Sequence, residues 1–331
     1  MKTNLPILCV ALSLAFMFTG CGDSGTSSNA AKRQVHKAPD AAALKLAFVT
    51  NNASEFWKIA SKGLDKFEKE TGIKVTMKQP PTGTAAEQKK IMEDLASQGY
   101  HGMAISPVDA SAQTGDLNDA CKVMNVICQD SDADKSNRLA YIGTNNFDAG
   151  KALGEELKKR VPGGGKAAVF VGTFTAANAR QRLEGIEAAL KGSNIEIVAK
   201  KEDNKVSVKA QTNVEDVMNA YADVTILLGL WSYNTPSIAA AVSSSPKKGK
   251  IIIAGFDEEE ATLNGIEKGE IIFTVVQKPF EFGYRSAKLL YELSKNGESA
   301  LPKDPIIDTG IEVIDSKNVA DFKARLAELK K

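Results

Sequence analysis

Short apolar runs alternate with longer amphipathic stretches through most of the chain after residue 43, and this alternation predicts the fold class. The apolar runs have the length and composition of strands that are buried on both faces, and most of the stretches between them have helical spacing. Strands and helices that alternate in this way form parallel sheets joined by right-handed crossovers. We expect strands at residues 44–50, 73–79, 101–106, 125–130, 139–143, 166–172, 195–200, 223–229, 250–257 and 271–277.

The first helical stretch shows the spacing most clearly. Its sequence, SEFWKIASKGLDKFEKETG, places apolar residues three or four positions apart, and Gly72 stands where a glycine commonly ends a helix. Ten strands would be unusual in one open sheet, so we expect two sheets of about five or six strands each. The apolar face of this helix comprises Phe56, Ile59, Ala60, Leu64 and Phe67.

The N-terminus resembles a bacterial secretion signal. Lys2 is the only charged side chain among residues 1–20, and a short apolar segment follows it. Small residues precede Cys21, as they precede the lipidated cysteine of a lipoprotein, and residues 21–43 have the polar, small-residue composition of a flexible tether. We therefore expect a signal peptide at 1–20, lipid on Cys21 and a tether at 21–43. An ordinary signal peptide, cut nearby, is the alternative.

The composition limits the function. The chain has 331 residues, of which 43% are hydrophobic and 25% are charged, so it is long enough for two domains of moderate size. Its formal net charge is +1, which gives no electrostatic case for binding nucleic acid. The only histidines are His36 and His101, so neither a catalytic triad nor a histidine-based metal site is expected. The glycine-rich turn at 163–166 follows a helix and precedes a strand, which is the reverse of a phosphate loop. No cofactor and no metal are expected.

Cys121 and Cys128 remain once the signal and the lipidated cysteine are set aside. Export would permit a disulfide between them. However, Cys121 falls late in an expected helix and Cys128 in the next strand, and a disulfide requires specific geometry. Two buried thiols are therefore the favoured prediction, and a disulfide is the alternative.

Polar and aromatic residues gather at the carboxyl ends of the expected strands, where open parallel sheets bind their ligands. Hydroxyl, amide and carboxylate groups beside flat aromatic faces suit a sugar or polyol. An alternative interpretation makes Asp130 and Asp257 an acid–base pair, although no other feature favours an enzyme. A further alternative makes Asp257 a helix cap for the acidic residues that follow it. The residues at these strand ends include Thr50, Ser106, Asp130, Trp231, Tyr233, Asp257 and Gln277, with Phe56 and Trp57 opening the first helix.

The ordered set of segments resembles the ribose/galactose type of periplasmic substrate-binding protein, the receptor of a sugar ABC importer. The resemblance covers roughly residues 44–315 and implies two Rossmann-like lobes with parallel sheets, joined by a three-strand hinge and closing over a sugar (the type I periplasmic binding protein fold). It implies one lobe at 44–144 plus 278–308 and another at 145–277 plus 309–331. The segments are LAFVTNNASEFWKIASKGLDKFEKETG, GMAISPVDASA, VICQDSD, YIGTNNFDAGKALGEEL, ARQRLEGIEAAL, IIIAGFDEE and IIFTVVQKPFEFGYRSAKLL.

The resemblance also implies ligand-binding roles. In the second lobe Arg182 matches an arginine that binds sugar hydroxyls, Asp257 matches an acceptor and Gln277 an amide at the hinge. Either Tyr233 or Asn234 falls where the family carries a polar pair. This sequence departs from the family at residues 130–132, where Asp-Ser-Asp replaces the usual Asp-Arg. The matching residues of the first lobe are Thr50, Ser54, Phe56, Trp57, Ser106 and Asp130.

The expected function is that of a monomeric, membrane-anchored binding protein that is not an enzyme. It would capture a sugar or polyol outside the cytoplasm and deliver it to an ABC permease. One alternative is a receptor that reports a sugar or autoinducer to a membrane sensor, and another is an exported carbohydrate-active enzyme. The sequence leaves open the identity of the sugar, the choice between transport and signalling, and which membrane holds the anchor.

Overall fold

The computed structural model describes residue 1 and residues 33–40 and 43–330. The described part of the chain contains twelve strands and ten α-helices. The first half contains β1 (Leu46–Val49), α1 (Phe56–Thr71), β2 (Val75–Lys78), α2 (Ala85–Ser97), β3 (Gly102–Ile105), α3 (Thr114–Cys121), β4 (Asn125–Gln129), β5 (Tyr141–Gly143), α4 (Asn146–Arg160) and β6 (Gly165–Val171). The second half contains α5 (Ala177–Leu190), β7 (Ile195–Glu202), α6 (Ser207–Ala220), β8 (Val224–Gly229), α7 (Asn234–Ser243), β9 (Ile252–Phe256), α8 (Glu260–Glu267), β10 (Phe273–Val276), α9 (Pro279–Asn296), η2 (Gly297–Ala300), β11 (Ile306–Asp308), β12 (Glu312–Asp315) and α10 (Val319–Leu329).

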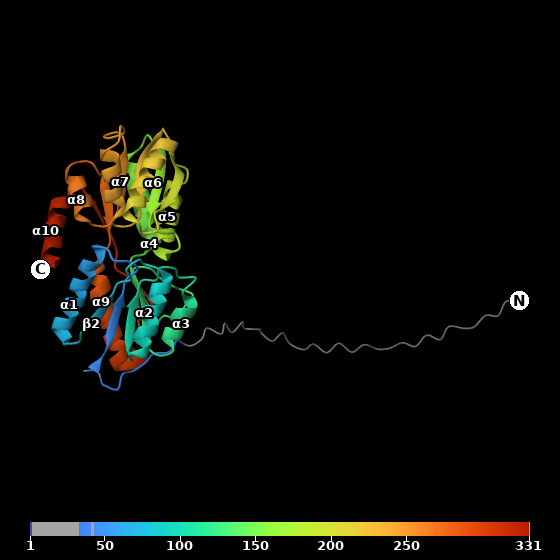
Figure 1. Cartoon of the computed structure of the whole chain (residues 1–331), viewed down its shortest axis with the longest axis vertical. Coiled ribbons are helices and arrows are strands. Elements are labelled where there is room, and N and C mark those ends of the chain that lie inside the picture. The colour runs from blue at the N-terminus through green and yellow to red at the C-terminus, as the bar shows by residue number, and fades with distance from the viewer. Residues whose placement is uncertain (2–32, 41–42, 331) are drawn as a thin grey trace, which may run out of the picture. The chain divides into compact units, whose positions relative to one another are not determined.

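The strands form two six-stranded sheets, each wrapped by helices (Figure 1). The first sheet has the order β11-β5-β4-β3-β1-β2, and the second has the order β12-β10-β9-β8-β6-β7. Ten strands in two sheets were expected, and all ten are present. The expectation of purely parallel sheets was wrong in one place, because the edge strand β12 pairs antiparallel with β10.

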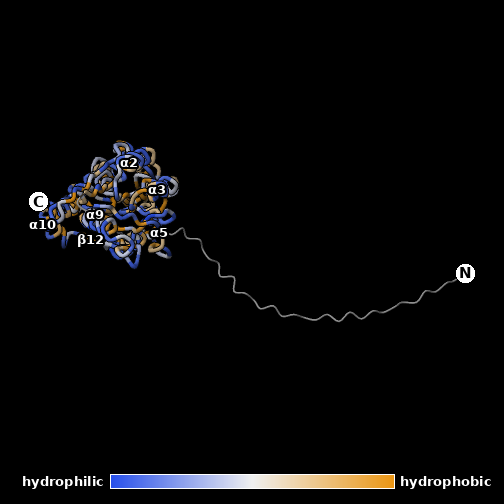
Figure 2. Tube along the Cα trace, turned by 90° about the horizontal axis from the view of Figure 1, so that it is seen from below, coloured by the Kyte–Doolittle hydropathy of each residue, from blue (hydrophilic) through white to orange (hydrophobic). Residues whose placement is uncertain are grey.

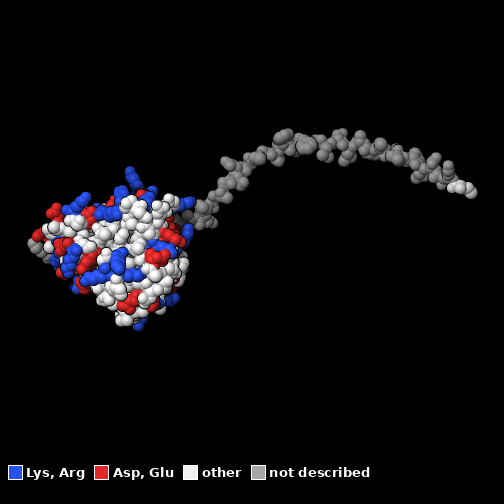
Figure 3. All heavy atoms as spheres, turned by 90° about the horizontal axis from the view of Figure 1, so that it is seen from above, with Lys and Arg blue, Asp and Glu red and all other residues white. Residues whose placement is uncertain are grey.

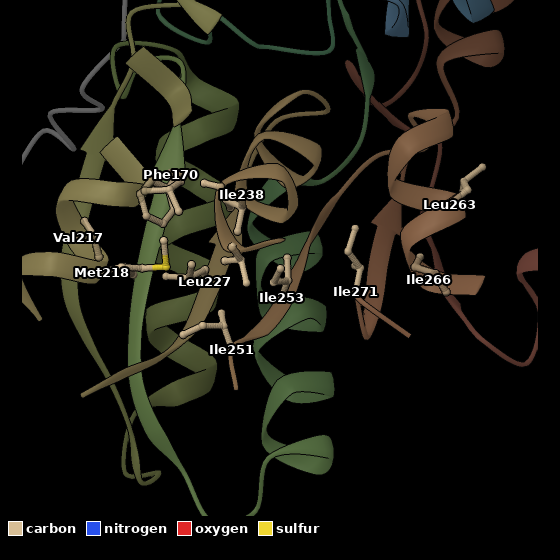
Figure 4. Packing of buried hydrophobic residues seen from close by; sticks show 14 of the residues in the cluster. Phe170, Val217, Met218, Leu227, Ile238, Ile251, Ile253, Leu263, Ile266 and Ile271 are labelled. Atoms are coloured by element: carbon tan, nitrogen blue, oxygen red, sulfur yellow. The ribbon is translucent and has the colours of Figure 1, made fainter. Parts of the chain in front are cut away.

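Each sheet is covered on both faces, as its continuous apolar strands require. In the first sheet Leu46 and Phe48 pack toward α1 and α9, whereas Ala47 and Val49 pack toward α2 and α3. The second sheet has one apolar cluster on the side of α4 and α5 and another on the side of α6, α7 and α8. Figure 4 shows residues of the latter cluster, in which Phe170, Leu227 and Ile253 project from the strands toward Met218 and Ile238.

The helices are amphipathic, and the hydropathy along their traces changes repeatedly from hydrophilic to hydrophobic (Figure 2). The expected apolar face of α1 is confirmed, because all five of its residues are buried. Gly72 ends α1 in the left-handed conformation, with φ of 74°, and donates its backbone N–H to the carbonyl of Glu68. This is the glycine-terminated helix end that the sequence predicted.

The chain crosses between the two sheets three times, after β5, after β10 and between β11 and β12. Helix α9 follows β10 of the second sheet but packs against α1 and the strands of the first. The first sheet is therefore built from residues near both ends of the described chain. The residue boundaries expected for the two lobes stay a prediction.

Cys121 and Cys128 are buried free thiols, which confirms the favoured prediction for this pair. Burial raises the pKa of Cys121 to about 12 and raises the pKa of Cys128 well above its usual value. Thiols with raised pKa values react slowly, because the thiolate is the nucleophile. Both side chains act as small apolar residues of the core.

The last part of the expected tether contacts the first lobe. The backbone N–H of His36 donates to Asn125 Oδ1 at 2.8 Å, and the Asn125 amide donates back to the His36 carbonyl at 2.8 Å. Ala38 donates its backbone N–H to the carbonyl of Ser294 in α9. Residues 2–20 of the expected signal peptide, and Cys21, lie outside the described residues. Among the helices that the structure describes, none is both long enough and apolar enough to cross a membrane.

Charged side chains of both signs are mixed on the surface. On the face shown in Figure 3, Lys and Arg lie interspersed with Asp and Glu. Many of the ion pairs among the described residues join neighbours on one helix, such as Lys58 with Glu55 and Arg285 with Glu281. Exposed pairs of this kind each contribute little to stability.

Candidate functional site

The carboxyl ends of several strands, together with the starts of α1 and α5, enclose a small cavity between the two lobes. Its volume is about 20 Å³, which is room for about one water molecule. Eight of the residues predicted to bind ligand line it, and four further lining residues were not predicted. The lining residues are Asn51, Asn52, Ser54, Phe56, Trp57, Asp130, Asn178, Arg182, Trp231, Ser232, Asp257 and Gln277.

Asp130 follows β4 and is the buried carboxylate of the first lobe. Its Oδ2 atom accepts three hydrogen bonds, from Ser106 Oγ at 2.6 Å, Asn178 Nδ2 at 3.1 Å and Asn51 Nδ2 at 3.2 Å. Burial raises the pKa of Asp130, while the hydrogen bond from Ser106 and the charge of Arg182 oppose the rise. The three donors fix the carboxylate in one orientation at the cavity wall.

Asp257 follows β9 and is the carboxylate of the second lobe that lines the cavity. Its Oδ1 atom accepts a hydrogen bond from Gln277 Nε2 at 2.8 Å, and its Oδ2 atom lies 3.9 Å from Arg182 Nη1. Burial raises the pKa of Asp257 to about 6. The alternative that Asp257 caps the following helix is wrong, because α8 begins at Glu260 and its N-cap residue is Glu259.

Arg182 is the buried cation of the site, and its side chain is 1% exposed. Its guanidinium donates to Asn146 Oδ1 at 2.9 Å and to the Leu230 carbonyl at 2.6 Å, and it lies over the Phe256 ring. Helix α5 holds Arg182 close to α4 because Gly150 faces it. A Cβ atom at Gly150 would lie 2.0 Å from the Arg182 carbonyl oxygen.

Two buried polar atoms at the cavity have no hydrogen-bond partner among the described residues, namely Arg182 Nη2 and Gln277 Oε1. One is a donor and the other is an acceptor. Leaving such groups unpaired away from water is unfavourable, commonly by about 1–3 kcal/mol each. A ligand whose hydroxyl groups both donate and accept would satisfy the two atoms together.

The two tryptophans come from different lobes and both line the cavity, and each makes a hydrogen bond beside it. Trp57 Nε1 donates to Asn52 Oδ1 at 3.0 Å, and Trp231 Nε1 donates to Asn178 Oδ1 at 3.3 Å. Trp57 also belongs to the core of the first lobe, where it packs edge-on against Phe48 and Phe56. The tryptophans therefore combine a structural role with an aromatic surface at the site.

Four predicted site residues do not line the cavity. Ser106 stands behind it and acts through Asp130. Thr50 donates its hydroxyl to the Asn52 carbonyl at 2.7 Å. Tyr233 and Asn234 both donate to Asp203, at 2.7 Å and 2.8 Å, because the buried carboxylate that follows β7 lies beside the start of α7.

Asn51, Asn52, Asn178 and Ser232 line the cavity but were not predicted as ligand-binding residues. Asn51 and Asn52 directly follow the first expected strand, and the strand-end rule selects Asn51 together with Thr50, although Asn51 was not taken as a ligand-binding residue. Asn178 lies in the first turn of α5 and donates across the cavity to Asp130. Asn178 reaches the cavity only because of the way the two lobes contact each other, and a local sequence pattern does not predict that contact.

Further contacts join the two lobes outside the cavity. Lys205 Nζ donates to the Gly83 carbonyl, and Thr175 Oγ1 donates to the Val108 carbonyl at 3.3 Å. Asn204 and Lys205 have positive φ values of 55° and 65°, so the turn after β7 adopts a backbone conformation that is unfavourable for residues other than glycine. The site is therefore enclosed by direct contacts between the lobes.

Two sheets that direct buried polar side chains into one interlobe cavity define a substrate-binding protein with two α/β lobes. The periplasmic binding protein domain family matches residues 46–299, and the chain belongs to this family. The D-allose-binding periplasmic protein of Escherichia coli is 26% identical over 275 residues, which cover 80% of this chain and 88% of that protein. The xylose/arabinose-binding protein XylF of Sulfolobus acidocaldarius is 25% identical over 248 residues, which cover 70% of this chain and 60% of XylF.

Solved structures with the same fold include several sugar-binding proteins. An ABC transporter solute-binding protein from Burkholderia graminis, in complex with D-arabinose, has a TM-score of 0.80 and 28% identity, covering 85% of this chain and 98% of that one. The glucose-galactose binding protein GanP of Geobacillus stearothermophilus has a TM-score of 0.77 and 27% identity, covering 83% and 98%. The XylFII–LytSN complex gives a TM-score of 0.75 and 26% identity, covering 83% and 99%.

Proposed function

We propose that this protein captures a sugar or polyol between its lobes and delivers it to an ABC importer. The observation that carries the proposal is the cavity between the two sheets, where Asp130 and Asp257 face Arg182 beside Trp57 and Trp231. Carboxylates accept hydrogen bonds from hydroxyl groups, a guanidinium donates to their oxygens, and indole rings pack on the apolar face of a sugar ring. The sugar-binding relatives support the same ligand class.

Entry of a sugar requires the lobes to separate, because the enclosed volume of about 20 Å³ is far too small for a sugar ring. The three crossings between the sheets provide the hinge for this motion. Opening breaks the hydrogen bond between Asn178 and Asp130 and exposes both carboxylates to water. The ligand then replaces water around them as the lobes close.

The test is a thermal-shift screen of pentoses, hexoses and polyols, followed by calorimetric titration of every sugar that stabilises the protein. A ligand present at one hundred times its Kd raises the free energy of unfolding by about 2.7 kcal/mol. We expect at least one sugar to give this shift with one site per chain. Failure of every sugar and polyol to bind would contradict the proposal.

Binding without chemistry is part of the proposal. The relatives are transport proteins and not enzymes, and the buried carboxylates are held by Ser106, Asn178 and Gln277 as hydrogen-bond acceptors. We expect the bound sugar to be recovered unchanged after prolonged incubation. Release of a modified product, lost in Asp130→Asn and Asp257→Asn, would favour the alternative of a carbohydrate-active enzyme.

The proposed location is outside the cytoplasm, with the protein anchored to a membrane by lipid on Cys21. Membership of the periplasmic binding protein family supports an extracytoplasmic location. The anchor rests on the resemblance of residues 1–21 to a lipoprotein signal. The partner expected at the membrane is the permease of an ABC importer, which a monomeric binding protein would approach with its sugar enclosed.

A receptor for a membrane sensor is the second candidate function. XylFII, to which this chain is similar, was solved in a complex with LytSN, and a receptor that reports to a sensor must likewise bind a second protein. The neighbouring genes discriminate the two functions, because an importer requires a permease and an ATPase, whereas signalling requires a sensor. Loss of sugar uptake on deletion of the gene would support transport, and loss of a transcriptional response with uptake intact would support signalling.

A further inference from the structure

A second cavity adjoins the small cavity of the candidate site. Its volume is about 290 Å³, which is close to the lower end of the usual range for small-molecule sites. Asn52 and Ser54 line both cavities, so the two adjoin at these residues. The walls of the second cavity come from both lobes, because Asn52 and Ser54 of the first lobe face Ser207 and Tyr233 of the second.

Two hydrogen-bonding groups at this junction have no partner among the described residues, namely the amide nitrogen of Asn52 and the hydroxyl of Ser54. Asn52 Oδ1 accepts from Trp57 Nε1 at 3.0 Å, which orients the amide and leaves its nitrogen free. An amide nitrogen carries two donors, and a hydroxyl group both donates and accepts. A ligand that extends from one cavity into the other would pass both groups and could bond to each.

Tyr233 provides an aromatic surface in the wall of the second cavity. Its ring is half-buried and packs edge-on against Trp231, with the ring centroids 6.4 Å apart. Its hydroxyl donates to Asp203 Oδ1 at 2.7 Å, and Asp203 Oδ2 accepts from Asn234 Nδ2 at 2.8 Å. These contacts hold the ring in one orientation. A fixed aromatic ring beside hydroxyl and amide groups suits a sugar ring.

The resemblance to sugar-binding proteins placed either Tyr233 or Asn234 at the ligand, yet neither lines the small cavity. Asn234 is turned into the protein, where it bonds to Asp203 and accepts the backbone N–H of Trp231 at 3.1 Å. Tyr233 lines the second cavity instead. A residue expected to bind ligand therefore contacts the space next to the small cavity.

Each charged side chain that lines the second cavity has a partner in the protein. Lys205 Nζ donates to the Gly83 carbonyl, and Glu55 pairs with a lysine on α1 at 2.8 Å. The carboxyl group of Glu259 hydrogen-bonds with Ser232. A neutral ligand group with several hydroxyls therefore suits this cavity better than an ion does.

A third cavity, of about 500 Å³, adjoins the small cavity on the side of α1, where Phe56 and Ser232 line both. It is larger, but it offers less for a sugar ring. Phe56 is only 7% exposed, whereas the ring of Tyr233 is half-buried. Lysine side chains at its rim, such as Lys58 and Lys330, are exposed to water. The second cavity is therefore the better place for an extension of the ligand.

We propose that the preferred ligand is a disaccharide, whose first ring binds beside Trp57 and Trp231 and whose second ring lies in the second cavity against Tyr233. This inference rests on the proposed sugar-binding function and specifies its ligand class. Asn52 and Ser54 hydrogen-bond to the disaccharide where its two rings are joined. Because both lobes line the second cavity, they hold the second ring between them as they close.

Matched sugars test the inference by calorimetric titration. Glucose is compared with maltose and cellobiose, galactose with melibiose, and xylose with xylobiose, while the methyl glycosides extend each sugar without a second ring. We expect at least one disaccharide to bind about tenfold more tightly than its monosaccharide and methyl glycoside. Equal or weaker binding of the disaccharide in every set would overturn the inference. Binding of monosaccharides in that case would leave the proposed function standing, whereas binding of no sugar or polyol would defeat both.

A pair of substitutions distinguishes the second cavity from the third. Ser207 begins α6 and Ala261 lies in the first turn of α8, and both are exposed. Ser207→Leu places apolar bulk in the second cavity, so we expect disaccharide affinity to fall about tenfold with monosaccharide affinity unchanged. Ala261→Leu places the same side chain in the third cavity and should change neither affinity. Unchanged disaccharide affinity in Ser207→Leu would overturn the placement, and a loss confined to Ala261→Leu would move the second ring to the third cavity.

Substitutions of Tyr233 identify the aromatic contact. Tyr233→Leu removes the ring, whereas Tyr233→Phe keeps the ring and loses only the hydroxyl that donates to Asp203. Both variants lose the same hydrogen bond, so the difference between them reports the ring. We expect the ratio of disaccharide to monosaccharide affinity to fall about three- to tenfold in Tyr233→Leu and to be retained in Tyr233→Phe. An equal fall in both variants would assign Tyr233 a structural role through Asp203, and no fall in either would exclude it from the ligand.

Discussion

Asp130 and Asp257 directly follow corresponding strands of the two sheets, and both have positive φ angles, of 59° and 70°, in the left-handed region. β4 and β9 occupy the third place in their respective sheets, counted from β11 and β12. A residue other than glycine in this conformation costs about 1–3 kcal/mol, and such strain concentrates at functional sites. The two lobes therefore present equivalent carboxylates to one cavity at a cost to stability.

Substitution of Asp257 should weaken ligand binding without unfolding the protein. Asp257→Asn keeps a side chain that tolerates positive φ but loses one acceptor oxygen. A hydrogen bond to a charged group contributes about 1.5–3 kcal/mol, so we expect affinity to fall about ten- to a hundredfold. Calorimetric titration measures the change, and Asp216→Asn, at an exposed position of α6, serves as the control. Unchanged affinity in Asp257→Asn would mean that Asp257 stabilises the local backbone and does not bind the ligand.

Protein stability should depend on pH through Asp257. Its pKa is about 6 in the folded protein, above the value of 3.8 for an ordinary aspartate. The folded state therefore binds more protons than the unfolded state between these values, and its stability falls as pH rises from about 4 to about 6. The slope approaches about 1.4 kcal/mol per pH unit for one proton. Asp130, Glu258 and Glu259 also have raised pKa values, so the difference between the unmodified protein and Asp257→Asn in denaturant titrations isolates the contribution of Asp257.

Tryptophan fluorescence should report ligand binding. Both indole rings line the cavity, so sugar that enters should change the emission of Trp57 and Trp231 with a single saturation curve. Trp231→Phe leaves Trp57 as the reporter and removes the hydrogen bond to Asn178. Trp57→Phe leaves Trp231 as the reporter and removes the hydrogen bond to Asn52. Each should weaken binding by roughly 0.5–1.5 kcal/mol. Two variants that both lose every ligand-dependent signal while still binding sugar would contradict this placement.

The hydrogen bond from Asn178 to Asp130 should stabilise the closed arrangement of the lobes. Asn178→Ala removes a donor from one lobe to a buried carboxylate of the other, with a distance of 3.1 Å between nitrogen and oxygen. We expect a fivefold to hundredfold loss of affinity, since the bond involves a charged group. Stopped-flow fluorescence should place most of the loss in faster dissociation. Asn178→Asp brings a second carboxylate against Asp130, and its affinity should be lower still.

Anchoring at Cys21 is tested by fractionation. Cys21→Ser should move the protein from the membrane fraction to the soluble fraction, because the lipid is the only anchor proposed. Sugar affinity should stay unchanged, because Cys21 lies outside the part of the chain that forms the two lobes. An unmodified protein found only in the soluble fraction would contradict the lipoprotein assignment.

The sequence revealed most of the fold because both sheets are buried on two faces. Continuous apolar runs such as 251–256 have few other interpretations, and each expected strand is present. β11 and β12 were not predicted, since they are three and four residues long and only partly buried. The antiparallel pairing of β12 depends on the last crossing between the lobes, and no pattern within so short a strand encodes its direction.

The site was predictable where a residue follows a buried strand and less so elsewhere. Asp130 and Asp257 satisfy this rule, and Arg182 came from the resemblance to a family. Tyr233 was expected to bind the ligand, but it binds Asp203, a buried carboxylate in the loop after β7 that lies beside the start of α7. Asn178 was missed because it lies within a helix, and its partner belongs to the other lobe. Contacts between distant segments are the information that a single sequence conveys least directly.

The three crossings between the sheets also determine when the protein can fold. β11 completes the first sheet by pairing with β5, so residues 306–308 must join residues 141–143, while α9 packs on α1 more than two hundred residues earlier. Closure of such long loops is slow and unfavourable until nearly the whole chain is available. The N-terminal segments therefore leave the ribosome well before their partners exist. The first lobe therefore cannot reach its final structure until late in the synthesis of the chain, when α9 and β11 have been made.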